Sequence, residues 1–479
     1  MTDDVQGYAP RTGEPYGSPV PATTPEQAAA VCTDLAGHEQ AWADAPRADR
    51  ARALDLIADE LDSHAAELTE LADAETALGR PRLTGEIART TGQLRLFAEL
   101  LREGGYQGVV VEPAEGARPD LRRIKRPTGL VAVFAASNFP FAFSVAGGDT
   151  ASALAAGCPV VVKAHEAHPL TARRTAELVR GALDRAGAPP VFALVHGVEA
   201  GVALVRHPAV TGVGFTGSTR GGLALAELCA RRPVPIPFYG ELGSVNPVVV
   251  LPGAAARDAA GLAQGYAGSL TLGVGQFCTN PGLAFVPQDD GLLAEFAKAV
   301  AQTGGGPMLS ARIHAGYAAG VAQLLDRPGV RLLAEGRAGE GPWAGTPALV
   351  AIPGELFDAE PEFFTEERFG PVGVLVLGDT LADAAGRVAA CPGSLTVSVH
   401  LDTADPADLA AAQRVLAVAR RRAGRLVVNG WPTGVAVSRA QHHGGPFPAG
   451  TSAAHTSVGT AAIERWLVPV VYQDCPPAL

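Results

Sequence analysis

From Gly129 onward the chain alternates between short apolar runs and alanine-rich helical stretches, and this alternation constrains the fold more than any other feature. The first two apolar runs are Leu130 to Ala135 and Pro159 to Lys163, and the helical stretches that follow them are Asp149 to Ala156 and Pro169 to Ala186. Strand, helix and strand in units of about 30 residues predict parallel strands joined by crossover helices, and hence a doubly wound α/β sheet. Such a sheet holds its ligands in a crevice at the carboxyl ends of its strands.

The alternation extends far enough along the chain to predict a second α/β unit. It continues through Val191 to His196, Ala200 to Arg206 and Val210 to Thr216, and it returns between residues 235 and 440 with different loops. The later apolar runs include Pro247 to Leu251, Gly370 to Leu377 and Leu426 to Gly430. Since 479 residues exceed what one hydrophobic core usually organises, we expect two α/β domains.

Segments outside this alternation predict a helical opening and a small β element. Apolar residues recur at spacings of three and four from about Arg47 to Gly105, which is typical of amphipathic helices. The polar stretch Gln107 to Arg126 contains the β-prone run Val109 to Val111 and suits a projecting hairpin. The C-terminal run Trp466 to Tyr472 has the composition of a strand and needs a partner strand.

Charge and cysteine usage exclude several classes of protein. A net charge of −11 disfavours a nucleic acid or an anionic membrane as the main partner, which leaves small molecules. The acidic start, Met1 to Val5, lacks the basic and apolar regions of a secretory signal, and no apolar run approaches the roughly 20 residues that span a bilayer. We therefore expect a cytoplasmic protein. The six cysteines form no CxxC pair, which predicts reduced thiols and no metal centre.

Three short patterns resemble known motifs without fitting them. Gly212 to Gly217 has the spacing of a dinucleotide fingerprint, yet its first two glycines fall inside an expected strand. His165 to His168 is one residue short of the zinc-binding HExxH spacing. The pair His442-His443 lies beside two glycines and could supply ligands, but such pairs are more often ordinary polar residues, and we interpret it that way.

Several segments in a fixed order resemble the aldehyde dehydrogenase superfamily over most of the chain. These segments are Ala136-Ser-Asn-Phe-Pro-Phe141, Val161-Val-Lys-Ala-His-Glu166, Phe215-Thr-Gly-Ser-Thr219, Glu241-Leu-Gly243 with Gly275-Gln-Phe-Cys-Thr279, and Glu366-Glu-Arg-Phe-Gly-Pro371. Further stretches are similar to the branch that acts on 2,5-dioxopentanoate, also called α-ketoglutarate semialdehyde. They are Ala72 to Leu78, Ser144 to Ala153, Gly240 to Pro247, Gly275 to Pro281 and Thr456 to Ile463.

The resemblance implies an α/β, aldehyde dehydrogenase-like fold with three parts. A Rossmann-type NAD(P)-binding domain would comprise residues 1–106 and 127–240, and an α/β catalytic domain would comprise residues 241–463. A small β oligomerisation element would comprise residues 107–126 and 464–479. This element implies a homodimer or a homotetramer, and the sequence leaves both open.

The expected nucleophile is Cys278. An aldehyde carbon does not readily release hydride, so a nucleophile must first convert it to a tetrahedral adduct, and a thiolate suits this task. The flanking Gly273, Gly275 and Asn280-Pro281 indicate a loop for Cys278, whereas we expect the other five cysteines to be buried apolar residues. Asn138 follows an expected strand, and its amide could donate to the oxyanion together with the Cys278 backbone N–H. The alternative for Asn138 is an Asx turn.

Glu241 is the expected base that activates water for hydrolysis of the thioester. It follows the strand-like run Pro235 to Tyr239, in the position that this family uses for the base, and few charges surround it. The alternative for Glu241 is a surface carboxylate at a strand end. A hydrolytic base also favours an enzyme that releases a carboxylic acid over a CoA-acylating relative, in which a thiol takes the acyl group.

The resemblance also implies a cofactor site for NADP or NAD. Lys163 and Glu166 would lie near the adenosine ribose, Gly217 and Ser218 near the diphosphate, and Glu367 with Phe369 near the nicotinamide ribose. Only three residues of the chain are Lys, which supports a specific role for Lys163 over a solvated one. Glu166 can accept hydrogen bonds from the free ribose of NAD but repels the extra phosphate of NADP, so the preference stays open.

Two functional hypotheses of different classes follow. The first is a dehydrogenase that oxidises a small aldehyde, α-ketoglutarate semialdehyde, with medium-chain aldehydes as the second choice. The second is a non-catalytic nucleotide-binding protein that keeps the fold, which the joint presence of Cys278, Glu241 and Asn138 argues against. Arg439 could contribute to recognition of a substrate carboxylate.

Overall fold

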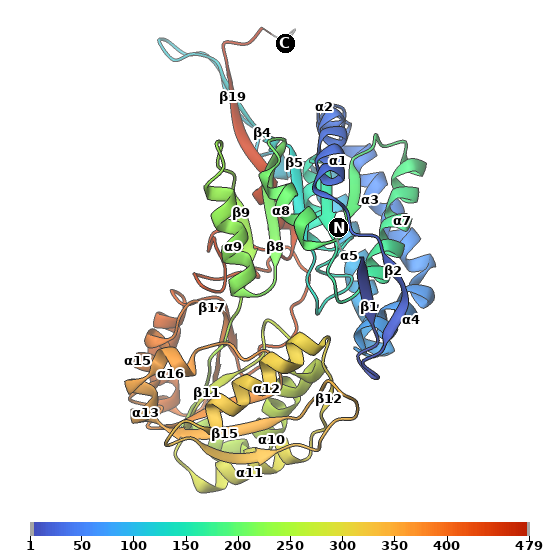
Figure 1. Ribbon diagram of the computed structural model, residues 1–479. Helices are drawn as coiled ribbons and strands as arrows, with labels where there is room; N and C mark the ends of the chain where they lie inside the picture. Colours follow the sequence, from blue (N-terminus) through green and yellow to red (C-terminus); the bar gives the residue numbers. More distant parts are fainter. Residues whose placement is uncertain (1–3, 477–479) are drawn as a thin grey trace.

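Two large sheets, one in each half of the chain, form the framework of the computed structural model, which describes residues 4–476 (Figure 1). The first sheet has five parallel strands in the order β7, β6, β5, β8, β9. They are β5 (Leu130–Phe134), β6 (Val160–Lys163), β7 (Phe192–Val195), β8 (Val210–Thr216) and β9 (Phe238–Glu241). The helices between them are α6 (Gly148–Ala156), α7 (Pro169–Ala186), α8 (Val198–Arg206) and α9 (Thr219–Ala230). The predicted doubly wound α/β sheet is confirmed.

Both faces of this sheet are covered, because successive residues of a strand point to opposite faces. In β5, Val131 and Val133 pack into one core with residues of α6 and α7, whereas Leu130 and Ala132 pack into another core with residues of α8. Amphipathic helices from the start of the chain complete these layers, as the spacing of their apolar residues predicts. They are α1 (Pro25–Gly37), α2 (Glu39–Ala43), α3 (Arg47–Ser63), α4 (Ala65–Thr76) and α5 (Arg80–Glu103), and the hairpin β1 (Val5–Tyr8) and β2 (Pro15–Val20) precedes them.

The second sheet has seven strands in the order β13, β15, β16, β11, β10, β17, β18, all parallel except the edge strand β13. The strands are β10 (Val248–Val250), β11 (Leu283–Pro287), β13 (Arg331–Glu335), β15 (Ala348–Pro353), β16 (Val372–Gly378), β17 (Ser394–His400) and β18 (Ala423–Val428). The main helices are α10 (Pro252–Thr271), α11 (Asp290–Ala301), α12 (Ala311–Leu325), α13 (Gly354–Ala359), α14 (Pro361–Phe364), α15 (Ala384–Ala390) and α16 (Pro406–Ala419). All seven residues of β17 are buried, as expected for a parallel sheet that is covered on both faces.

A three-stranded antiparallel sheet projects from the body of the protein (Figure 1). Its central strand β4 (Leu121–Pro127) pairs with β3 (Val110–Glu112) on one side and with β19 (Leu467–Gln473) on the other. The predicted hairpin and the predicted partner strand of the C-terminal run are therefore both present.

The carboxyl ends of the first sheet meet at one place. Phe134, Lys163, Thr216 and Glu241 are the last residues of β5, β6, β8 and β9, and all four line one cavity of about 810 Å³. Residues of α12 and of the loop before β16 line the same cavity from the side of the second sheet. This is the crevice that the strand–helix alternation predicts.

Candidate active site

Cys278 lies on a loop that follows a tight turn, and the geometry of that turn requires its glycines. The loop follows the short helix η2 (Leu272–Gly275), and Gly273 and Gly275 have φ of 57° and 68°. A Cβ on Gly275 would lie 2.3 Å from the backbone of Gly370, so no larger residue fits. Asn246 anchors the other end of the loop, because its Nδ2 donates to the carbonyl oxygen of Cys278 at 2.8 Å. The thiol is thereby held at the cavity wall, half-buried.

The Cys278 thiol is close to two other ionisable side chains, Glu241 and His443. The Nε2 atom of His443 lies 3.6 Å from Cys278 Sγ and 3.0 Å from Glu241 Oε1. The thiol sulfur, one imidazole nitrogen and one carboxylate oxygen of these three residues all lie within 4.8 Å of one another. Ser457 adds a fourth contact, since its hydroxyl donates to Glu241 Oε2 at 2.6 Å.

These contacts determine which groups are charged. Burial opposes ionisation of Glu241, but its interactions with His443 and Ser457 hold the pKa of this carboxyl below its usual range. Burial raises the pKa of the Cys278 thiol well above its usual value, and the negative charge of Glu241 raises it further. The resting site therefore pairs an ionised carboxylate with a protonated thiol.

Asn138 faces this cluster from the loop after β5. Its Nδ2 atom donates to the carbonyl oxygen of Gln276 at 3.0 Å, two residues before Cys278 in the chain. The side chain thus bridges to the Cys278 loop, and the alternative of a local Asx turn is not what the structure has. Asn138, Glu241 and Cys278 all line the large cavity.

The six predicted cofactor residues line this cavity as well. They are Lys163, Glu166, Gly217, Ser218, Glu367 and Phe369. The predicted site residues are spread over more than 200 positions of the chain, and the fold brings all of them to the wall of this cavity.

Local geometry gives several of these residues features that suit a dinucleotide. Lys163 forms an ion pair with Glu166, whose pKa is lowered because Lys163 and His165 outweigh the effect of burial. Ser218 caps the N-terminus of α9, where its Oγ accepts from the N–H of Gly221 at 3.3 Å, and such a helix end attracts anions.

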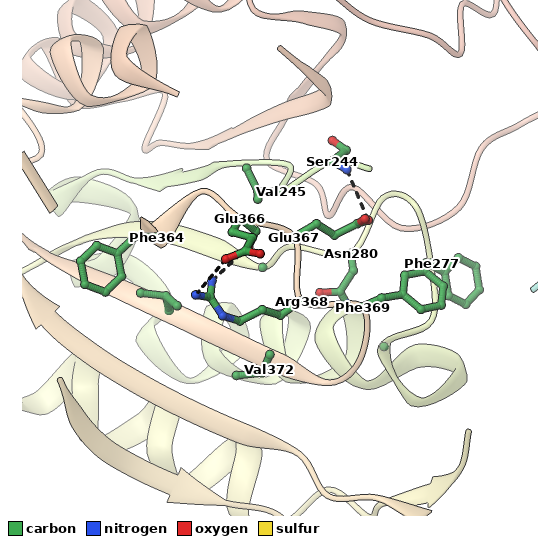
Figure 2. A pocket seen from close by; sticks show the side chains of 13 residues that line it. Ser244, Val245, Phe277, Asn280, Phe364, Glu366, Glu367, Arg368, Phe369 and Val372 are labelled. Carbon is green, nitrogen blue, oxygen red and sulfur yellow. Dashed lines mark hydrogen bonds and ion pairs between the residues drawn. The ribbon is translucent and has the colours of Figure 1, made fainter. Parts of the chain in front are cut away.

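Glu367 occupies a confined position next to the Cys278 loop. Its Oε1 atom accepts a hydrogen bond from the Ser244 N–H at 3.3 Å, and a Cβ on Gly243 would lie 2.4 Å from its Oε2. Figure 2 shows this carboxylate reaching Ser244, while the neighbouring Arg368 turns away to pair with Glu366. Burial raises the pKa of Glu367 to about 7. Near physiological pH this side chain is therefore present both as a neutral carboxylic acid and as a carboxylate.

The structure also shows where two residues lie whose position the sequence left open, His443 and Arg439. His443, interpreted as an ordinary polar residue, contacts both Cys278 and Glu241, and the only sequence signal was its pairing with His442 beside two glycines. Arg439 forms a surface ion pair with Glu103 at 2.6 Å and is not among the residues that line the cavity.

Two further expectations concern cysteines and helices. Four of the other five cysteines are buried as expected, whereas Cys475 is only half-buried. Within residues 4–476, none of the helices combines the length and the apolar character needed to cross a bilayer.

Comparison with known proteins identifies the class. Residues 2–469 match the aldehyde dehydrogenase family, and the chain belongs to that family. It is therefore an oxidoreductase that oxidises an aldehyde with NAD or NADP, and the non-catalytic alternative is set aside.

Two named relatives are similar over most of their length. The chain is 46% identical to α-ketoglutaric semialdehyde dehydrogenase 2 of Azospirillum brasilense, over 99% of this chain and 92% of that protein. It is 43% identical to α-ketoglutaric semialdehyde dehydrogenase of Acinetobacter baylyi, over 90% of this chain and 83% of that protein.

Solved structures share the fold. PnpE in complex with nicotinamide adenine dinucleotide is 23% identical with a TM-score of 0.84, and the match covers 99% of this chain and 94% of that one. A 3,6-anhydro-L-galactose dehydrogenase is 24% identical, also with a TM-score of 0.84, and the match covers 99% of this chain and 96% of that one.

Proposed function

We propose that this protein oxidises α-ketoglutarate semialdehyde to α-ketoglutarate through a thioester on Cys278. The observation that carries the catalytic part is the convergence of Cys278, Glu241 and His443 within 4.8 Å at the wall of the cavity. The relatives at 46% and 43% identity, whose names specify this aldehyde, support the substrate. Medium-chain aldehydes are the alternative substrates.

In the first step the Cys278 thiol loses its proton and attacks the carbonyl carbon. His443 Nε2 at 3.6 Å and the Glu241 carboxylate are the groups within reach of that proton. The new C–S bond moves an electron pair onto the carbonyl oxygen. Asn138 and Cys278 both line the cavity, so the second N–H of Asn138 Nδ2, the one not used on Gln276, and the Cys278 backbone N–H are the candidate donors to this oxyanion.

The second step requires a hydride acceptor and a base. A bound NAD or NADP would supply the acceptor for the hydride of the tetrahedral carbon, and the acyl group would then remain on Cys278 as a thioester. Glu241 then takes a proton from a water molecule whose oxygen attacks the thioester carbon. The C–S bond breaks, the carboxylic acid leaves, and Cys278 Sγ regains a proton. Ser457 and His443 serve this step by keeping Glu241 ionised.

The residues around the cavity fit the cofactor. Gly217 and Ser218 lie at the N-terminus of α9, where backbone N–H groups can hold the diphosphate. Lys163 and Glu166 offer a cation and a carboxylate to the adenosine ribose, and Glu367 with Phe369 would contact the nicotinamide ribose. The ionised Glu166 favours free ribose hydroxyls over an added phosphate.

The remaining parts of the chain have proposed roles as well. We assign cofactor binding to residues 1–106 and 127–240, catalysis to residues 241–463, and subunit pairing to residues 107–126 and 464–479, of which 1–3 and 477–479 lie outside the described part. Exposed valines at 109, 110, 111, 470 and 471 on the projecting sheet support the pairing role, in a homodimer or a homotetramer.

The test is reduced-nicotinamide absorbance with NAD or NADP and a panel of α-ketoglutarate semialdehyde, succinate semialdehyde, propanal and octanal. We expect the five-carbon oxo acid to give the highest kcat/KM. Cys278→Ala should abolish hydride formation, and Glu241→Gln should keep a hydride burst while slowing turnover. Cys475→Ala, half-buried and outside the cavity, is the matched control. Full steady-state activity in Cys278→Ala or Glu241→Gln would remove the role assigned to that residue.

A further inference from the structure

One face of helix α5 presents two arginines and a glutamate to the loop that contains Asn138. Arg82, Glu86 and Arg89 are spaced four and three residues apart, which places them on one side of the helix. Arg82 Nη2 donates to the carbonyl oxygen of Asn138 at 2.6 Å. Glu86 Oε1 accepts from the backbone N–H groups of Phe141 and Ala142 at 2.8 and 3.0 Å.

Phenylalanine rings stack against these arginines, which are both partly buried. The Arg82 guanidinium carbon lies 4.6 Å from the centre of the Phe277 ring, and that of Arg89 lies 5.3 Å from the centre of the Phe143 ring. Phe139 packs edge-on against both of these rings with centroid distances of 5.3 Å. Phe139, Phe143 and Phe277 together form what we call the aromatic box. The guanidinium group of Arg82 lies against the Phe277 ring, and that of Arg89 lies against the Phe143 ring.

The arginines of this box have hydrogen-bond donors that no neighbouring side chain within residues 4–476 uses. Burial lowers the pKa of both arginines, and the nearby Glu86 carboxylate opposes that effect on each of them. Glu86 is the carboxylate that acts on both guanidinium groups, and Glu241 acts on Arg89 as well. Among the described residues, the Arg89 guanidinium contacts the Phe139 and Phe143 rings, and the buried Nη1 of Arg82 has no hydrogen-bond partner. Donors of both arginines are thus available to an anion.

The box is next to the reacting thiol but outside the cofactor cavity. Phe277 directly precedes Cys278 in the chain, and the Phe143 ring lies 6.2 Å from the His443 ring. The positive charge of Arg89 partly opposes the rise in the pKa of Cys278 that burial and Glu241 cause. Neither arginine is among the residues that line the 810 Å³ cavity. A substrate bound to Cys278 would therefore lie beside this aromatic box.

We propose that Arg89, assisted by Arg82, binds the carboxylate of an oxo-acid aldehyde while the phenylalanine rings enclose its methylene chain. This inference rests on the proposed function, and it names the group that selects a carboxylate-bearing substrate. A carboxylate would accept from the unused donors of these arginines, and a guanidinium can bind it through two parallel hydrogen bonds. Arg89 is the better test residue, because Arg82 also holds the backbone of Asn138.

The test compares Arg89→Gln and Arg89→Lys with the wild type on α-ketoglutarate semialdehyde and on pentanal, an uncharged aldehyde of equal length. The ratio of the two kcat/KM values should fall by about 10- to 100-fold in Arg89→Gln, since a hydrogen bond to a charged group contributes about 1.5–3 kcal/mol. Arg89→Lys should recover part of this loss. Arg95→Gln is the matched control on the same helix, because Arg95 pairs with Asp59 and Asp62 at the surface. An unchanged ratio in Arg89→Gln would overturn the inference.

A binding measurement separates this inference from the proposed function. Isothermal titration of the holoenzyme with α-ketoglutarate, the expected product, should give a Kd at least tenfold weaker in Arg89→Gln than in the wild type or Arg95→Gln. If the wild type oxidises pentanal but not the oxo acid, the proposed substrate fails, and the titration still decides the role of Arg89. Equal binding of α-ketoglutarate by all three proteins would refute that role.

Discussion

Replacing Ser457 with alanine removes the hydroxyl group that donates to Glu241 Oε2 over 2.6 Å. The lost bond stabilises the ionised form of Glu241 more than the protonated form, because a carboxylate is the stronger hydrogen-bond acceptor. In the wild type, His443 and Ser457 together outweigh burial and hold the pKa of Glu241 below its usual range. Without the hydroxyl, burial is opposed mainly by His443, so the pKa must rise.

The size of the shift follows from the strength of that bond. A hydrogen bond to a charged group contributes about 1.5–3 kcal/mol, and one pKa unit corresponds to about 1.36 kcal/mol. Ser457→Ala should therefore raise the pKa of Glu241 by about one to two units. Because the base must be deprotonated to activate water, the acid limb of deacylation should move to higher pH by the same amount.

Stopped-flow absorbance separates the two phases that this prediction concerns. The hydride burst reports acylation and the following linear phase reports deacylation, so each can be measured as a function of pH. Ser452→Ala is the control, because Ser452 lies in the same segment but its hydroxyl contacts His455 at 2.7 Å and not Glu241. If the acid limb of the linear phase is unchanged in Ser457→Ala, our account of how Glu241 is kept ionised is wrong.

Three further predictions test separate parts of the molecule. Asn138→Ala should lower kcat for hydride formation by about 100- to 1000-fold because it removes one oxyanion donor, and a burst rate within threefold of the wild type would contradict this. Glu166→Ala should raise the ratio of kcat/KM for NADP to that for NAD by about tenfold, since it removes a carboxylate that repels the added phosphate. An unchanged ratio would mean that the adenosine ribose does not bind next to Glu166. Val471→Asp should shift the protein to a smaller species in light scattering, because Val471 is 55% exposed on the projecting sheet. An unchanged mass would exclude this sheet as the interface.

The sequence by itself determined the architecture and the chemistry-bearing motifs. Helix α7 and strand β8 have the bounds that the apolar pattern predicted, and the strand–helix alternation predicted the crevice at the carboxyl ends of the strands. This was feasible because the patterns are local: side-chain periodicity depends on residues a few positions apart. Cys278, Glu241 and Asn138 could be named because each lies in a short motif whose residues are contiguous.

Only the tertiary structure decided which distant side chains surround those three residues. His443 is 165 positions from Cys278, and Ser457 is 216 positions from Glu241, so no local pattern relates them. The same holds for Arg89, whose place against the Phe143 ring depends on how helix α5 packs. Arg439, by contrast, pairs with Glu103 at the surface. Contacts of this kind depend on packing between elements, and packing is a property of the folded chain as a whole.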